Sequence, residues 1–234
     1  MRATGSPIER LRSPAAGSAY NADKCRRKFL KHFPRGFHDQ KYWAWERGYK
    51  WAAHEKWVDY LPKATFEDLL ERKRFEEIGS LALRTLSGTN LIFSFENMAL
   101  RDALKTKTGA ETFAKGLFQL VYGKGPMPEK FDGWCDAIAS LPKKQSRVLT
   151  HPIATVFGFV AQPAKHIFLK PNVTKTAAAA YGFDFEYNSR PSWRTYSSLL
   201  EFANVLKSDL ADLDPRDMID IQSFIWVLGS DEYR

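Results

Sequence analysis

The sequence predicts a mainly α-helical protein, a multi-helix globular domain with at most a few short extended segments. Apolar residues recur three and four positions apart in most of the chain, which is the period of a helix with one buried face. Only residues 166–169 and 183–187 alternate in the manner of a strand. With 234 residues, 44% of them hydrophobic and 14% aromatic, the chain can bury a sizeable core.

The first twenty residues differ in composition from the rest. Residues 1–20 are rich in Ser, Ala, Gly, Pro and Arg and show no apolar period, so they are predicted to form a disordered basic tail. A helical region is expected over residues 21–161. Its first helix is predicted to begin at Asn21 or Asp23 and to end before Pro34, which breaks it.

The rest of this region is expected to consist of further helices and one buried run. After the aromatic segment 39–61, helices are predicted over 65–88, 91–104 (apolar positions Leu91, Phe95, Met98 and Ala99), 109–122 and 131–141. The apolar run 148–161 is expected to lie in the core. At this length it is too short to cross a bilayer, which takes about 20 apolar residues.

Residues 162–234 are predicted to form a C-terminal helical region that packs on the preceding one as a single globular unit. The expected N-caps of its three helices are Thr174, Ser192 and Asp214, with Gly182 directly after the end of the first helix and Pro215 opening the last. The last of these helices is apolar on nearly all sides. It is therefore expected at the centre of a core.

Charge and cysteine content indicate a cytoplasmic protein with reduced thiols and no membrane segment. Cys25 and Cys135 have no partner spacing, which argues against a disulfide framework or a metal site. The first residues contain no apolar signal region. Residues 1–60 carry 13 Lys and Arg against six Asp and Glu, out of a net charge of +8 for the chain. This excess is compatible with an anionic partner such as nucleic acid, and a solvated basic face gives the same count.

The aromatic segment is the first candidate binding element. Trp and Tyr alternate there with basic residues, and Lys50, Trp51 and Lys56 are the candidate contacts. Bases of a single strand stack on aromatic rings while lysine neutralises phosphate. Core packing is the simpler interpretation, because aromatic side chains at helical spacing are usually buried.

The second candidate is an anion site at the start of a helix, formed by Lys170, Asn172, Thr174 and Lys175. Main-chain amides at a helix N-terminus bind phosphate, and two ammonium groups add positive charge. The chain contains no GxxxxGK[ST] motif, so this signal is far weaker than a nucleotide-binding loop. Ordinary capping with solvated lysines explains it equally.

The third candidate is a polar set in the C-terminal region. Asp217 and Asp220 share one helix face and are the candidate pair for a divalent cation or for acid–base chemistry. Arg190 and Arg194 in the same set are candidate contacts for nucleic acid or another anion. Pairing of the aspartates with Arg190 or Arg194 is the structural alternative. No cofactor is predicted and no catalytic residue is assigned, because the sequence lacks HExxH, HxxxH and GxSxG.

Several stretches resemble one family of bacterial proteins. They are HIFLKPNVTKTAAAAYGFDFEYNSRPSWRTYSSLLEF, PRDMIDIQSFIWV, YWAWERGYKWAAHEKW and NLIFSFENMALRDAL, which together cover most of the chain after about residue 20. The family has no established activity, so the resemblance implies no catalytic residues. Segments similar to the C-terminal block occur near restriction or phage-defence ATPases, which favours a role linked to nucleic acid by analogy.

Three functions are therefore considered. The first is a nucleic-acid-associated binding or adaptor protein without catalysis of its own. The second is a protein-interaction module that docks a partner through its aromatic surface or its C-terminal DEYR tail. The third is a metal-assisted hydrolase that uses Asp217 and Asp220. Whether the protein is an enzyme is left open by the sequence.

Overall fold

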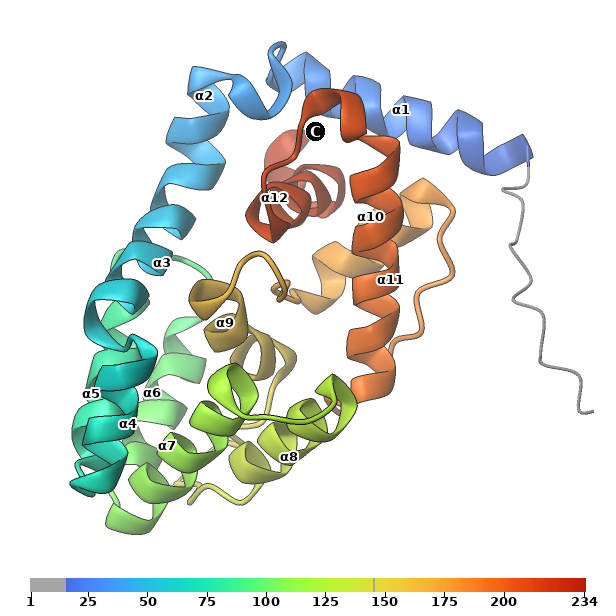
Figure 1. Ribbon diagram of the computed structural model, residues 1–234. Helices are drawn as coiled ribbons and strands as arrows, with labels where there is room; N and C mark the ends of the chain where they lie inside the picture. The colour runs from blue at the N-terminus through green and yellow to red at the C-terminus, as the bar shows by residue number, and fades with distance from the viewer. Residues whose placement is uncertain (1–15, 145) are drawn as a thin grey trace, which may run out of the picture.

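The computed structural model describes residues 16–144 and 146–234, and it is helical throughout (Figure 1). The α-helices are α1 (Ala16–His32), α2 (Gln40–Tyr42), α3 (Gly48–Tyr60), α4 (Lys63–Glu71), α5 (Phe75–Thr85), α6 (Ser94–Leu104), α7 (Lys107–Tyr122), α8 (Met127–Ala139), α9 (His151–Ala161), α10 (Pro171–Tyr181), α11 (Trp193–Asp209) and α12 (Met218–Gly229). Short 3₁₀ turns lie at Gly36–His38, Ala211–Leu213 and Asp231–Tyr233, and a π-helical turn, Trp43–Arg47, joins α2 to α3. The mainly α prediction is confirmed. Within the described ranges neither 166–169 nor 183–187 forms a strand.

Two helices occupy the centre of the fold. All of α9 is buried, as predicted for the apolar run 148–161, and ten of the twelve residues of α12 are buried. In Figure 1 α12 is seen nearly along its axis, with α1 above it, α2 and α3 on one side and α11 on the other. Its central position was also predicted. Because α12 packs on α1, α10 and the π-helical turn, the buried side chains of residues 21–161 and 162–234 form one continuous core.

The predicted disordered tail, residues 1–20, lies only partly within the residues that the structure describes. Residues 1–15 of the expected tail lie outside the described residues, and residues 16–20 form the first turns of α1. The helix predicted over 65–88 is in fact two helices, α4 and α5. Lys73 takes a left-handed conformation with φ 56°, and the amide of Arg74 donates to the carbonyl of Leu69. This is the geometry that ends a helix after its C-cap, here without the glycine that usually signals it.

Three other predictions are wrong in detail. Thr174 is buried inside α10, which begins at Pro171, so it is not an N-cap. Asp214 has φ 52° and precedes α12, whose N-cap is Asp217, with its carboxylate accepting from the amide of Ile219. In α6 the buried face carries Glu96, Leu100, Ala103 and Leu104. Phe95 and Met98, which were expected on the apolar face, are instead exposed.

No described helix combines the length and apolar character needed to span a membrane.

Candidate nucleic-acid interface

The π-helical turn Trp43–Arg47 separates inward from outward side chains. Glu46 and Arg47 are each 3% exposed, whereas Trp43 is 46% and Trp45 56% exposed. A π-helical turn holds one residue more than an α-turn and is frequent at functional sites. Here it turns two adjacent charged residues into the core and leaves two tryptophans on the surface. Residues 42–50 therefore have a polar interior side and an aromatic exterior side.

On the interior side, Arg47 binds both aspartates of α12. Its two terminal nitrogens donate to the carboxylate oxygens of Asp217 at 2.8 and 2.7 Å, a bidentate pair, and Nη1 also donates to Oδ1 of Asp220 at 2.9 Å. The predicted partners, Arg190 and Arg194, are exposed, and Arg194 pairs with Glu186 instead. The ion-pair interpretation of the two aspartates is therefore correct, but the cationic partners are Arg47 and the neighbouring Arg216 in place of Arg190 and Arg194.

Asp220 has no solvent-exposed surface and is saturated with donors. The hydroxyl of Tyr42 donates to it at 2.6 Å, and Arg216 donates through its main-chain amide and its guanidinium at 2.9 to 3.1 Å. Burial, and then the charge of Asp220, raises the pKa of Tyr42 well above its usual value. Because these bonds and those of Arg47 occupy Asp217 and Asp220, the pair leaves little room for a cation. The described residues also contain no group of three potential ligands suited to a metal ion.

A second buried pair continues this network. Lys50, 1% exposed, donates to Glu46 at 3.0 Å and to the hydroxyl of Ser223 at 2.8 Å, and Tyr233 donates to the other oxygen of Glu46. Burial lowers the pKa of Lys50, and the neighbouring Glu46 opposes this effect. The structure thus removes Lys50 from the surface on which it was predicted. Tyr233 of the DEYR tail is likewise tied into the fold rather than free to dock a partner.

On the exterior side, Trp45 lies among basic residues. The ammonium of Lys41, one turn earlier, is 4.2 Å from the centre of a Trp45 ring. Partial burial and then the charges of Lys31, Lys41 and Lys28 lower the pKa of the His32 imidazole. These lysines come from α1 and α2. They account for part of the basic excess in the first 60 residues.

Lys170 lies beside a second group of exposed rings. Its ammonium is 4.1 Å from the ring centre of Phe93 and 5.7 Å from that of Trp226, and Phe93 stacks on Phe95 with centroids 5.5 Å apart. Phe93 is 50% and Phe95 56% exposed. Loss of solvent around the half-buried ammonium lowers the pKa of Lys170. The long bonds of Lys170 go to the carbonyl oxygens of residues 90 and 91, at 3.4 Å.

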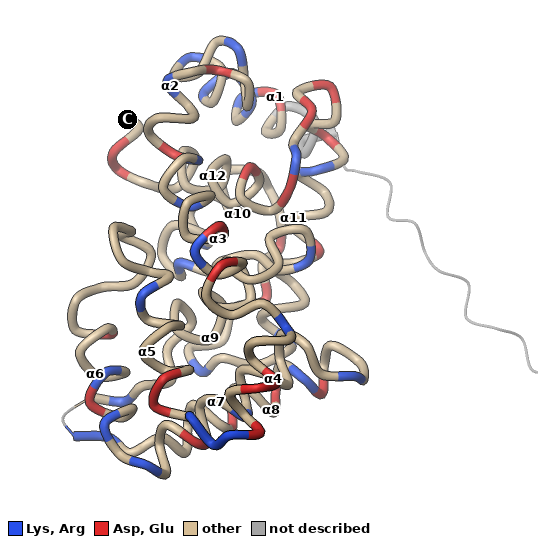
Figure 2. The backbone as a smooth tube through the Cα atoms, turned by 60° about the vertical axis from the view of Figure 1, so that its left-hand side comes forward, with Lys and Arg blue, Asp and Glu red and all other residues tan. Residues whose placement is uncertain are grey.

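Tyr49 adds a further ring beside Lys170 and Trp226. Tyr49 follows Trp45 by one turn and lines a small hollow together with Lys170, Trp226 and the buried Gln222. We call the set Lys41, Trp45, Tyr49, Phe93, Phe95, Lys170 and Trp226 the aromatic face. Figure 2 shows the C-terminal end of the chain and α6 along the same edge of the backbone. Glu232, whose carboxylate accepts from Trp226 at 3.3 Å, brings negative charge to the face.

The other predicted contacts in the aromatic segment, Trp51 and Lys56, make hydrogen bonds within the protein. Trp51 is half-buried, between Arg47 and His54, and donates to Glu55 at 2.9 Å. Lys56 donates to the carbonyl of Ser87 at 2.6 Å.

At the predicted anion site on α10, Lys170 belongs to the aromatic face and Asn172 is exposed. Thr174 is buried, and the ammonium of Lys175 sits 4.7 Å from the ring centre of Tyr187. The four residues therefore do not converge on one anion. The exposed pair Phe93 and Phe95 was not predicted as part of a binding site.

Comparison of the chain with protein-family models, with curated proteins and with solved structures finds no match in any of the three.

Proposed function

We propose that the protein binds single-stranded nucleic acid on the aromatic face and acts as a binding or adaptor module without catalysis of its own. The observation that carries the proposal is the exposure of Trp45, Phe93 and Phe95 by about half, with a lysine ammonium against the rings of Trp45 and Phe93. Exposed large aromatics beside cations match the stacking surfaces of single-strand binders, where rings take bases and ammonium groups take phosphates.

The interior network supports this role by fixing the turn that carries Trp45. Trp45 follows Lys41 and precedes Glu46 on a turn whose inner side is fixed by ion pairs to α12. A stacking surface gains affinity when its side chains are ordered before binding, because less conformational entropy is then lost. The buried charges thus position the aromatic residues and need no catalytic role of their own.

The test is a fluorescence anisotropy titration of the full chain with labelled single-stranded and duplex oligonucleotides at low and physiological salt. Trp45→Ala and Phe95→Ala are expected to weaken single-strand binding about 5- to 150-fold each, from a stacking contribution of about 1–3 kcal/mol per base. Val205→Ala, an exposed apolar residue on α11 that is 36% exposed, is the matched control and should leave binding unchanged.

Charge variants give an independent check. Lys41→Ala should weaken binding and flatten its salt dependence, because one fewer counterion is released, while Lys207→Ala on α11 should do neither. Glu232→Gln should strengthen binding by removing a negative charge from the aromatic face. The proposal is contradicted if the parent protein does not bind at low salt. It is also contradicted if the parent binds duplex and single strand equally and Trp45→Ala does the same.

A protein partner is the second candidate, and the observation that favours it is Met98, 60% exposed beside the exposed Phe95. Met and aromatic side chains are enriched in the cores of protein interfaces. Association through this apolar pair would be insensitive to salt and would be lost in Met98→Ala. Light scattering in low and high salt separates the two candidates, since phosphate binding weakens steeply as salt rises.

A further inference from the structure

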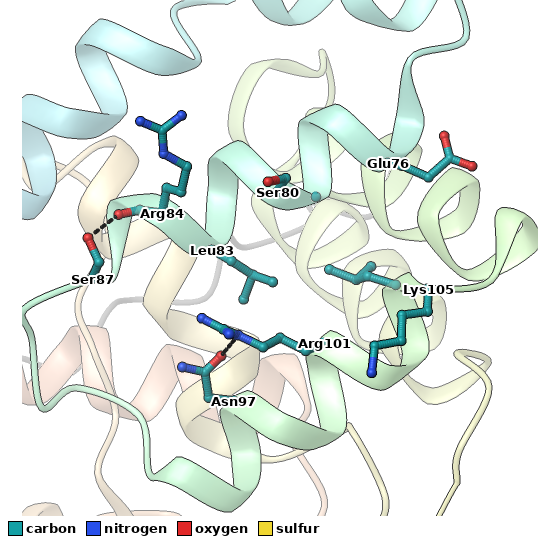
Figure 3. Close-up of a pocket in the computed structure, with 10 residues that line it drawn as sticks. Glu76, Ser80, Leu83, Arg84, Ser87, Asn97, Arg101 and Lys105 are labelled. Carbon is teal, nitrogen blue, oxygen red and sulfur yellow. Dashed lines mark hydrogen bonds between the residues drawn. The ribbon is translucent and has the colours of Figure 1, made fainter.

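A cleft between α5 and α6 lies on the lower part of the molecule in Figure 1, and Figure 3 shows it in detail. Glu76, Gly79, Ser80, Leu83, Arg84 and Ser87 line it from the α5 side, and Asn97, Arg101, Leu104 and Lys105 from α6. Both helices pack on α7. Ser87 and Asn97 lie at one end of the cleft and Glu76 and Lys105 at the other, so the two helices run in opposite directions along it.

The floor of the cleft is apolar and its size suits a small molecule. Leu83 points into the space between the helices, and Leu104 packs so closely on Gly79 that a β-carbon there would lie 3.2 Å from the leucine methyl. The cleft offers about 400 Å³, within the range of about 300–1,000 Å³ that small-molecule sites occupy. Sites of this kind combine an apolar floor with a few polar groups that fix the orientation of the ligand.

Arg101 supplies the main polar group. Its Nε donates to Oδ1 of Asn97 at 3.0 Å, and this bond orients the guanidinium group. Within the described part of the chain no carboxylate pairs with Arg101, whereas Lys105, one turn later, is bound to Asp102 at 2.6 Å. The terminal nitrogens of Arg101 are therefore free to bind a carboxylate in the bidentate manner.

The other charged residues of the cleft restrict the charge that a ligand can carry. Arg84 does not share this role, because its guanidinium lies 4.7 Å from the ring centre of Tyr60 and points away from Arg101. Glu76 has no ion-pair partner among the described residues and places a negative charge at the far end of the cleft. A second negative charge on the ligand would be repelled there, so a monoanion fits better than a dianion.

We propose that the α5–α6 cleft binds a small organic monocarboxylate with an apolar body, the carboxylate on Arg101 and the body over Leu83 and Leu104. The site is separate from the aromatic face and does not depend on nucleic-acid binding.

The experiment is an NMR titration of the ¹⁵N-labelled full chain with 4-phenylbutyrate and, as the uncharged analogue, 4-phenylbutan-1-ol. The acid is expected to bind with a dissociation constant in the millimolar range, the strength typical of a ligand this small, and to shift the amide signals of Ser80, Leu83 and Leu104 and the Nε signal of Arg101. Phenyl phosphate, a dianion, should bind more weakly, and Glu76→Gln should reduce that difference.

Variants separate the charge contribution from the apolar one. Arg101→Gln should weaken the acid about tenfold and leave the alcohol unchanged, since a hydrogen bond to a charged group is lost. Ser80→Phe, at an exposed rim position, should fill the cleft and abolish binding of both, while Lys207→Gln on α11 should change neither. Equal affinity for acid and alcohol, shifts that map outside the cleft, or unaltered affinity in Arg101→Gln would overturn the proposal.

Discussion

Replacing Asp220 by asparagine tests whether the interior network is structural. The carboxylate is fully buried and accepts from Tyr42 at 2.6 Å, from Arg47 at 2.9 Å and from Arg216 through three nitrogens. Asparagine keeps the volume but removes the charge, and its amide NH₂ faces donors instead of accepting from them. The substitution therefore leaves Arg216 without its carboxylate partner and leaves Arg47 paired with Asp217 alone.

The expected cost is large. Breaking a buried ion pair by removing one partner costs about 3–5 kcal/mol, because the other charge stays desolvated. In a protein of 150–250 residues each kcal/mol moves the melting temperature by about 2–4 °C, so Asp220→Asn should lower it by about 6–20 °C. Asp212→Asn, at an exposed pair with Arg26, is the matched control and should cost less than about 1 kcal/mol.

Urea unfolding followed by far-ultraviolet circular dichroism measures both variants, with anisotropy titrations at a temperature where each is folded. The network is structural if Asp220→Asn loses stability and the folded fraction still binds nucleic acid like the parent. A stability within about 1 kcal/mol of the parent would refute this reasoning. If a metal-dependent hydrolytic activity were also lost in that folded variant, the aspartate would have to be assigned to catalysis.

Three further predictions concern the core. Burial lowers the pKa of His166 to about 4, below the value of about 6.5 for an unfolded histidine. Unfolding therefore takes up a proton between pH 6.5 and 4, and the free energy of unfolding falls as pH falls through that window. Urea titrations at pH 7 and pH 5 should show a loss of about 2 kcal/mol that is absent in His166→Asn. Gly229→Ala should destabilise the protein by more than about 2 kcal/mol in the same assay, because the new β-carbon would lie 2.0 Å from the carbonyl oxygen of Val173. Gly133 has open space around it, so Gly133→Ala should stabilise the protein by about 0.5–1 kcal/mol. Burial raises the pKa of Cys135 to about 12, so its thiol should react with a disulfide reagent only as fast as the protein unfolds, and a rapid reaction of the folded chain would contradict its burial.

Much of the fold was predictable because helical periodicity reports burial directly. The segment 148–161 and the final helix were placed in the core from their apolar content alone, and both are buried. Failures occurred where one residue takes a conformation that its type rarely adopts. Lys73 and Asp214 are left-handed, and no glycine marks either position. In α6 the apolar stripe through Phe95 and Met98 was mistaken for the buried face, which instead contains Glu96.

The site was less predictable, because its interior partners are distant in sequence. Glu46 and Lys50 are four residues apart, a spacing that normally indicates a solvated surface pair, and nothing local shows that both are buried. The partners of Asp217 and Asp220 were sought on the preceding helix, whereas Arg47 lies 170 residues away. The aromatic segment was singled out from the sequence, but only the structure separates the exposed Trp45 from the half-buried Trp51.

The sequence separation within the interior network also sets an order of events during synthesis. The bonds from residues 42–50 to α12 and Tyr233 span 170 to 187 residues. At a translation rate of about 5–20 residues per second, Glu46, Arg47 and Lys50 emerge about 9–37 s before their partners exist. Throughout that interval their charges favour hydration over burial, so the nascent π-helical turn cannot close on its final neighbours. We expect the upper half of the molecule to become protease-resistant only after α12 has left the ribosome.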